Sequence, residues 1–149
     1  MDTEQEHSSA SLSASGWRER KLPGFAGLVG PLWMRKEEAL WAYGLLATPD
    51  HTNPVGLVHG GLLTTLMDYA LGAIAWEAVD RRACVTVQLD THFVSAARPG
   101  QFLEARGRVV RATSSLVFLQ GRVEVAGSEI IVASAVFKVI DKPAARVSQ

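Results

Sequence analysis

The stretch NPVGLVHGGLLTTLMDYALGAIAW, residues 53–76, decides how this chain folds. From Gly60 onward its apolar residues recur every three or four positions, which is the spacing of a helix with one apolar face. These residues are Leu63, Leu66, Met67, Ala70 and Ile74. Asp68 is the one carboxylate in this otherwise uncharged run. The pattern therefore predicts a long helix over residues 60–76 that is buried or half-buried and carries a single acidic side chain.

Asp68 lies on a stripe of small side chains along this helix. At about 100° per residue, the small residues of the stripe fall within roughly 60° of Asp68. They are Gly61, Thr64, Thr65, Gly72 and Ala75. Small side chains let another backbone or a narrow substrate come close. A surface aspartate usually has charged neighbours, and here Glu77 is the only other charge before Asp80. These features favour a functional carboxylate over an ordinary surface one.

Length and composition allow one globular domain with a proper core, because 48% of the 149 residues are hydrophobic. Fifteen basic residues balance fifteen acidic ones, so no basic stripe favours nucleic-acid binding as the main function. The single cysteine, Cys84, rules out an internal disulfide framework and fits a reducing compartment. The chain start lacks the pattern of a secretory signal, and no run reaches about 18 apolar residues. We therefore expect a cytoplasmic protein that does not enter a membrane.

The composition also suggests where the domain begins and ends. Residues 1–23 open with a polar, serine-rich segment, which is typical of a disordered or poorly ordered tail. We expect the folded domain over residues 24–142 and a short C-terminal tail over residues 143–149.

After the helix the apolar period changes from about 3.6 to 2. Strands are predicted over residues 84–94, 102–110, 116–125 and 130–140, separated by short turns that favour an antiparallel meander. In the first of these, Val85, Val87, Leu89 and Phe93 alternate with Thr86, Gln88, Asp90 and His92. Two more strands, residues 31–36 and 39–47, precede the helix. Two strands, a helix and four strands predict an α+β fold, with one long central helix packed on a curved antiparallel sheet.

Three parts of the sequence carry a resemblance to a known family: residues 53–61 together with Asp68, the strand 85–87, and the turn 98–100. The chain resembles the hotdog-fold acyl-CoA thioesterases of the phenylacetate-degradation type, which have an aspartate in the helix. The resemblance implies the hotdog fold and hydrolysis of an acyl-CoA or aryl-CoA thioester to the free acid and CoA. It implies no cofactor, since coenzyme A is part of the substrate.

Thioester hydrolysis needs donors for the developing oxyanion and a base or nucleophile. Because His59-Gly60-Gly61 opens the helix, the N–H of Gly60 or Gly61 is a first-turn donor without an intrahelical partner. We assign the Gly60 N–H to the thioester carbonyl and Asp68 to the role of base or nucleophile. His59 is interpreted as a residue that caps the helix and orients the glycines, rather than as an acid–base catalyst.

Other candidate residues have a structural alternative beside the functional one. The resemblance implies that Asn53 donates to the same carbonyl oxygen, although a turn residue before Pro54 would look the same. It also implies that Thr86 holds the water or the aspartate, where β-propensity alone would also place a threonine. For the CoA nucleotide, the resemblance points to Arg111, Thr113 and Ser114.

Two further questions concern a metal and the acyl pocket. A metal site built from His51, His59, Asp68 and His92 lacks a recognised ligand spacing, and the resemblance explains these residues without a metal. We therefore expect none. Four aromatic residues either line an acyl pocket or fill the core: Trp33, Trp41, Trp76 and Phe93.

Asp68 follows Gly60 by eight residues, which is about 12 Å along a helix. A base must lie within hydrogen-bond reach of the reacting centre, so Asp68 should serve the helix start of a second subunit. We expect a homodimer, or a tetramer made of two dimers, with two shared sites per pair. A hotdog protein that binds acyl-CoA or an acyl carrier without catalysis is the alternative. A dehydratase is disfavoured, because the family pattern there pairs a carboxylate with a histidine.

Overall fold

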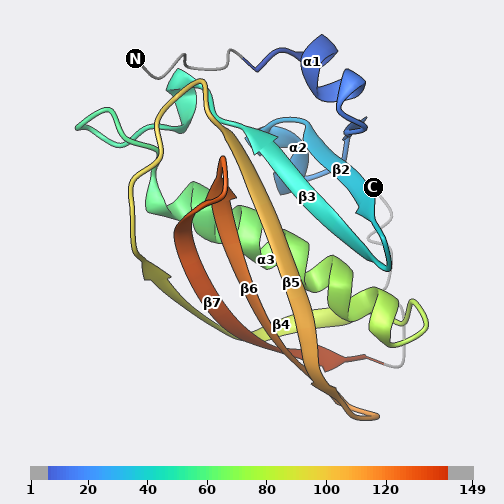
Figure 1. Ribbon diagram of the computed structural model, residues 1–149. Coiled ribbons are helices and arrows are strands. Elements are labelled where there is room, and N and C mark those ends of the chain that lie inside the picture. Colours follow the sequence, from blue (N-terminus) through green and yellow to red (C-terminus); the bar gives the residue numbers. More distant parts are fainter. Residues whose placement is uncertain (1–6, 141–149) are drawn as a thin grey trace, which may run out of the picture.

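The computed structural model describes residues 7–140. In this part of the chain, the long helix α3 (Gly60–Ala78) lies across a seven-stranded antiparallel sheet that curls around it (Figure 1). The strands are β1 (Arg18–Arg20), β2 (Leu32–Glu37), β3 (Leu40–Leu46), β4 (Cys84–Phe93), β5 (Phe102–Ala112), β6 (Leu116–Val125) and β7 (Ser128–Val139). Three short helices complete the described chain: α1 (Ser9–Ala14), α2 (Phe25–Val29) and the 3-10 turn η1 (Pro49–His51). The predicted α+β architecture is confirmed.

The order of strands in the sheet differs from a simple meander. It runs β1-β2-β3-β5-β6-β7-β4, so β5, β6 and β7 form the meander while β4 pairs with β7 at the edge. The prediction that β4 continues directly into the meander is wrong. The segment after β4 bonds to the helix entrance instead of forming a tight turn, since Ala97 accepts from the N–H of Val58. This longer connection carries the chain across to β5, which pairs with β3.

The helix lies close to the sheet because the sheet has glycines beneath it. Gly107 and Gly121 face each other across β5 and β6. A Cβ at Gly107 would come within 2.5 Å of Leu71, and one at Gly121 within 2.7 Å of Met67. Both leucine and methionine are fully buried. Glycine at these two strand positions therefore lets the apolar face of α3 pack directly on the backbone of the sheet.

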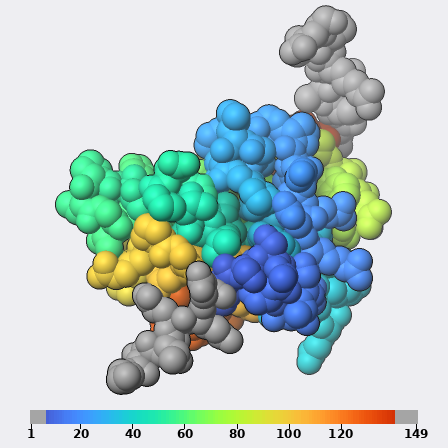
Figure 2. Space-filling view, turned by 90° about the horizontal axis from the view of Figure 1, so that it is seen from above, coloured from blue at the N-terminus to red at the C-terminus, as the bar shows by residue number. Residues whose placement is uncertain are grey.

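The N-terminal segment is ordered where the sequence predicts a poorly ordered tail. Helix α1 begins with a capping box between Ser8 and Ser11. Leu12 and Trp17 are buried, and the Trp17 ring meets the ring of Phe102 edge-on at 4.9 Å between centroids. Figure 2 shows this segment, in dark blue, packed against the body of the molecule. Two large apolar residues thus dock an otherwise polar segment. Residues 1–6 of the predicted N-terminal tail, and the predicted C-terminal tail over residues 143–149, lie outside the described residues.

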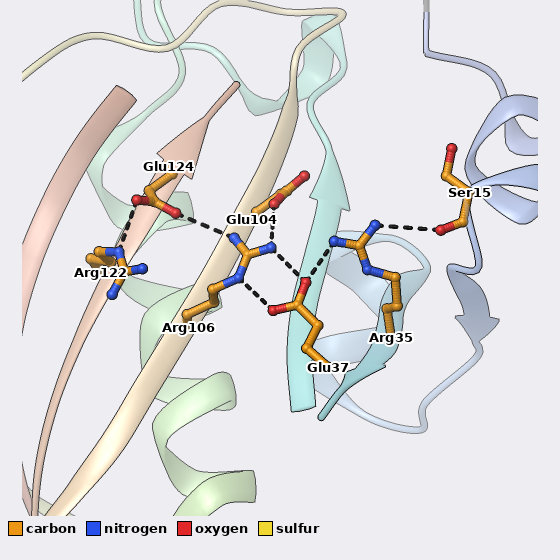
Figure 3. A network of polar contacts seen from close by, with 7 residues as sticks. All are labelled: Ser15, Arg35, Glu37, Glu104, Arg106, Arg122 and Glu124. Atoms are coloured by element: carbon orange, nitrogen blue, oxygen red, sulfur yellow. Dashed lines mark hydrogen bonds and ion pairs between the residues drawn. The ribbon is translucent and has the colours of Figure 1, made fainter. Parts of the chain in front are cut away.

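A charged network covers part of the sheet face opposite α3 (Figure 3). The guanidinium of Arg106 contacts Glu37 at 2.8 Å, Glu104 at 2.7 Å and Glu124 at 3.2 Å. Arg35 also pairs with Glu37 and donates to the backbone oxygen of Ser15, next to α1. Hydrogen bonding from Arg106 is the main reason that the pKa of Glu37 is lowered from 4.5 to about 2. The network therefore ties the N-terminal segment to the middle of the sheet.

In the part of the chain that the structure describes, no helix has the length and apolar character needed to cross a membrane.

Candidate active site

Helix α3 begins at a loop whose hydrogen bonds single out one donor. His59 is the N-cap residue, and its Nδ1 accepts the N–H of Gly61 at 2.8 Å. This bond is the capping role expected for His59, and it uses the Gly61 donor. Among the described residues, no oxygen or nitrogen accepts the N–H of Gly60. The sequence alone did not decide whether Gly60 or Gly61 donates to a ligand. In the structure, Gly60 is the one of the two whose N–H is available.

The loop before the helix is shaped by Asn53. Its Oδ1 accepts the N–H groups of Val55 and Leu57, each at 3.1 Å. Its own N–H donates to the Leu57 oxygen at 2.8 Å. The turn role considered for Asn53 is therefore present in the structure. Since both side-chain bonds use Oδ1, the amide NH2 group is the part of Asn53 that can donate to a substrate oxygen.

His51 links this loop to helix α2. Its Nε2 lies 2.6 Å from the Val29 oxygen, and its Nδ1 accepts the N–H of Thr48 at 3.0 Å. The neutral tautomer with a proton on Nε2 satisfies both contacts. The His51 oxygen in turn accepts the N–H of His59 at 2.8 Å. His51 thus holds the helix entrance in place, and within residues 7–140 no three His, Cys, Asp or Glu side chains are grouped so that they could bind a metal ion.

Asp68 is half-buried on α3 and is held from the neighbouring strand. The Thr86 hydroxyl, on β4, donates to Asp68 Oδ1 at 2.6 Å. A hydrogen bond to a carboxylate is short and strong, so it fixes the rotamer of Asp68. The structure thus brings together the two residues that the resemblance associates. Within one chain, Asp68 and Gly60 remain about 12 Å apart along the same helix.

Strand β4 contains a β-bulge that the sequence pattern did not reveal. Its register with β7 shifts between Thr86 and Gln88, which makes Val87 the extra residue. Thr86 pairs with Phe137 and Phe93 with Ile131, both of which are buried. Residues seven apart lie on opposite faces of a regular strand, but the bulge places Thr86 and Phe93 on the same face.

The bulge corrects the predicted faces of β4. The strict alternation expected Val85 and Val87 to share a face with Leu89 and Phe93, opposite Thr86. In the structure Val85 is exposed, whereas Leu89 packs on the core and Thr86 reaches Asp68. The local sequence offered no turn residue that marks the bulge. Strand β4 thus touches the helix twice, at Asp68 through Thr86 and at Gly60 through Phe93.

The residues predicted for the CoA nucleotide lie at the end of β5, in the case of Arg111, and in the turn between β5 and β6, in the case of Thr113 and Ser114. The Thr113 side chain stabilises that turn, because its Oγ1 accepts the N–H of Leu116 at 3.0 Å. Leu116 pairs with Lys138, and Lys138 pairs with Val85. Arg111, Thr113 and Ser114 therefore lie at the end of the sheet near Thr86, away from Phe93 and the helix start. The structure does not bring them to Gly60 of the same chain.

The comparisons with known proteins identify the family. The model of the thioesterase superfamily matches residues 55–131. The chain belongs to the thioesterase superfamily. A Pseudomonas aeruginosa protein named as an esterase is 36% identical to this thioesterase over 110 residues, which is 72% of this chain and 81% of the relative.

Solved structures agree with the fold of this thioesterase. Zebrafish thioesterase superfamily member 2 matches with a TM-score of 0.72 at 20% identity, over 80% of this chain and 88% of its own. A Bacillus halodurans protein solved with CoA matches with a TM-score of 0.62 at 28% identity, over 66% of this chain and 70% of its own. A phenylacetic acid degradation-related protein of Ralstonia eutropha matches with a TM-score of 0.60 at 24% identity, over 89% of this chain and 92% of its own. The predicted hotdog fold and the predicted class, a thioester hydrolase, are confirmed.

Proposed function

We propose that this thioesterase hydrolyses acyl-CoA or aryl-CoA thioesters at sites that are each shared between two subunits. The Gly60 N–H of one subunit polarises the thioester carbonyl, and Asp68 of the other subunit acts as base or nucleophile. The observation that carries the proposal is the division of these groups. Asp68 is held by Thr86, while the donor that lacks an acceptor within residues 7–140 lies at Gly60, about 12 Å away on the same helix.

The edge strand supports the pairing of two subunits. Strand β4 ends the sheet, and its ten residues leave one row of backbone groups without a strand partner in the described chain. Val87 on this strand is 59% exposed. Long edge strands with apolar side chains are normally covered. A second copy that pairs along β4 about a two-fold axis would cover the edge and continue the sheet.

Such a pairing also sets the register of the two helices. If two α3 helices run antiparallel and Gly60 of each meets Asp68 of the other, the two-fold axis passes near Thr64. Thr64 and Thr65 donate their hydroxyls to Gly60 and Gly61 oxygens of their own helix, at 2.9 and 2.8 Å. Their hydrogen bonds are thus satisfied locally. The stripe of small residues can then approach the partner helix without leaving polar groups unpaired.

The chemistry follows from these positions. The Gly60 N–H, with the Asn53 amide, stabilises the negative charge that develops on the thioester oxygen. Asp68 either takes a proton from the attacking water or attacks the carbonyl carbon itself, forming an anhydride that water then cleaves. In both routes the carbon–sulfur bond breaks, water supplies the new carboxyl oxygen, and CoA leaves as the thiol. Thr86 is a positioning residue, because it keeps one Asp68 oxygen engaged while the other faces the reaction.

Coenzyme A as the carrier is supported by the Bacillus halodurans relative, which was solved with CoA. The segment from Arg111, near the end of β5, to Ser114 in the following turn is the candidate site for its phosphates. Membership of the thioesterase superfamily favours an enzyme over the alternative of a non-catalytic acyl-CoA binding protein. A dimer or a tetramer of two dimers, and a cytoplasmic location, stay predictions from the sequence.

The test is the isosteric change Asp68→Asn. It should abolish turnover of a panel of CoA thioesters while the protein keeps its melting temperature and its affinity for CoA. Calorimetric titration with CoA separates binding from catalysis. Near wild-type hydrolysis by this variant would contradict the catalytic assignment of Asp68.

A further inference from the structure

The side chain of Phe93 lies directly against the helix start. A Cβ built on Gly60 would be 3.2 Å from Cε1 and 3.3 Å from Cζ of the Phe93 ring. The edge of the ring therefore rests on the Gly60 backbone, next to the N–H that has no acceptor among the described residues. Yet Phe93 is 53% exposed. A large apolar side chain that is half in solvent beside a free donor is suited to border a ligand.

The strand ladder fixes this ring in place. Phe93 pairs with Ile131 of β7, and the next residue, Val94, donates its N–H to the Ile130 oxygen at 2.9 Å. Both isoleucines are buried. The ring thus projects from an anchored strand end and not from a loose loop. It is a fixed wall at one side of Gly60.

The other aromatic candidates are engaged elsewhere. Trp33 is buried in the cluster around Trp17 and Phe102. The Trp41 ring lies under the ammonium of Lys36, and the Trp76 ring under the guanidinium of Arg81. Of the four residues that the sequence left open between core and acyl pocket, Phe93 is the one seen to contact Gly60.

We propose that Phe93 forms the wall of the acyl pocket beside the thioester carbonyl and limits the size of the acyl group. Here we rely on the proposed function, in which the Gly60 N–H binds the carbonyl. A carbonyl oxygen held about 2.9 Å from that nitrogen brings the first acyl carbons next to whatever covers Gly60. Acyl pockets need apolar walls, and the phenyl ring supplies one. Bulk close to the carbonyl then meets the ring, so the enzyme prefers slim acyl groups.

The experiment compares acetyl-CoA with benzoyl-CoA in wild type, Phe93→Ala and Phe93→Trp. Opening the wall should raise the kcat/KM ratio of benzoyl-CoA to acetyl-CoA by roughly tenfold or more, because a misfit of even one methylene in an apolar pocket has an effect of about that size and the benzoyl group is larger by a whole ring. The larger ring of Phe93→Trp should lower the same ratio. The matched control is Phe118→Ala, which truncates a 36% exposed phenylalanine on the opposite face of the sheet. Its ratio should equal that of wild type.

Three outcomes would overturn the inference. Equal loss of kcat/KM for both thioesters would place the ring on the pantetheine arm that they share. Unchanged ratios in both Phe93 variants, with an active wild type, would reject the wall while leaving the proposed function intact. Wild type inactive on every thioester would reject the proposed function and this role together. Should Phe93→Ala not fold, Phe93→Leu takes its place, and melting curves and size-exclusion profiles accompany each variant.

Discussion

The Thr86 hydroxyl donates to the Asp68 carboxylate at 2.6 Å, joining the edge strand of the sheet to the middle of its helix. The two residues are eighteen positions apart in sequence. Asp68 alone on α3 would have several rotamers. The bond from Thr86 selects one of them, so the strand controls the direction of the proposed catalytic carboxylate.

Removing the Thr86 hydroxyl should therefore impair catalysis more than folding. In Thr86→Val the shape is kept and the bond to Asp68 is lost, so kcat should fall roughly tenfold to a hundredfold, the value of a hydrogen bond to a charged group. KM should change little. Steady-state kinetics with a thermal melt measure both effects. Thr86→Ser, which keeps the hydroxyl, should restore most of the rate, and wild-type kcat in Thr86→Val would show that the bond has no catalytic role.

A charge on the edge strand should separate the subunits. Val87 is largely exposed on β4 in the isolated chain, and Val87→Lys would bring two like charges together in a pair formed along this edge. The dissociation constant of the dimer should rise roughly tenfold or more. Turnover should fall as the fraction of dimer falls. Analytical ultracentrifugation together with activity at matched concentrations tests this. Phe118→Lys, on the opposite face, is the control, and an unaltered dimer in Val87→Lys would argue against β4 as the interface.

The local parts of the fold could be predicted from the sequence because local spacing determines them. Leu66 and Met67 recur with the helical period, and both are buried on α3. Asp68 and Gly60 stood out for the same reason: one charge and two adjacent glycines break an apolar pattern. The distance between Gly60 and Asp68 along the helix could be predicted from the number of residues between them.

The remaining features depend on contacts between distant segments. Strand periodicity does not say which strands are neighbours, so β4 beside β7 could not be predicted. The bulge at Val87 is set by how β4 meets β7, and it places Thr86 on the same face as Leu89 and Phe93, where the alternation predicted the opposite face. Leu12 and Trp17 order the N-terminal segment only because Phe102 is nearby. The periodicity of one segment does not show which distant segments it contacts.

The bulge leads to a prediction about deletions in β4. Without Val87 the strand becomes regular, and Thr86, Leu89 and Phe93 still face the helix. Deleting Asp90 instead turns either Leu89 or Phe93 away from α3. The melting temperature should therefore fall less for the Val87 deletion than for the Asp90 deletion. Circular dichroism melts of the two variants measure this, and an equal or larger fall for the Val87 deletion would mean that the bulge itself is needed.

Acid should weaken the network around Arg106. The pKa of Glu37 is lowered from 4.5 to about 2, chiefly by its hydrogen bond from Arg106. A carboxyl group with a lowered folded-state pKa stabilises the fold fully above its unfolded value, and this stabilisation is lost as pH falls toward the folded value. The free energy of unfolding should thus decline between pH 4.5 and about 2. In Glu37→Gln the decline should be shallower, as urea titrations at several pH values would reveal; an identical slope would exclude Glu37 as a contributor.

The division of the site between subunits can be tested by mixing two inactive variants. Asp68→Asn removes the base. Gly60→Pro removes the N–H donor at the first helical position, where the helix backbone accepts proline, and His59 before it already has the extended backbone that precedes proline, with φ −63° and ψ 135°. The proline Cβ would lie 3.2 Å from the Phe93 ring, so this half-exposed ring has to shift by a few tenths of an ångström. Each variant alone should form inactive dimers.

Co-expression with two different tags yields the mixed dimer. In it, Gly60 of the Asp68→Asn chain meets Asp68 of the Gly60→Pro chain, which completes one site, while the other site carries both defects. The mixed dimer should therefore show about half the wild-type turnover. Dimers of each variant, purified through the same two tags, are the controls. If each chain held its own complete site, every site in the mixed dimer would still contain one defect, and no activity would return.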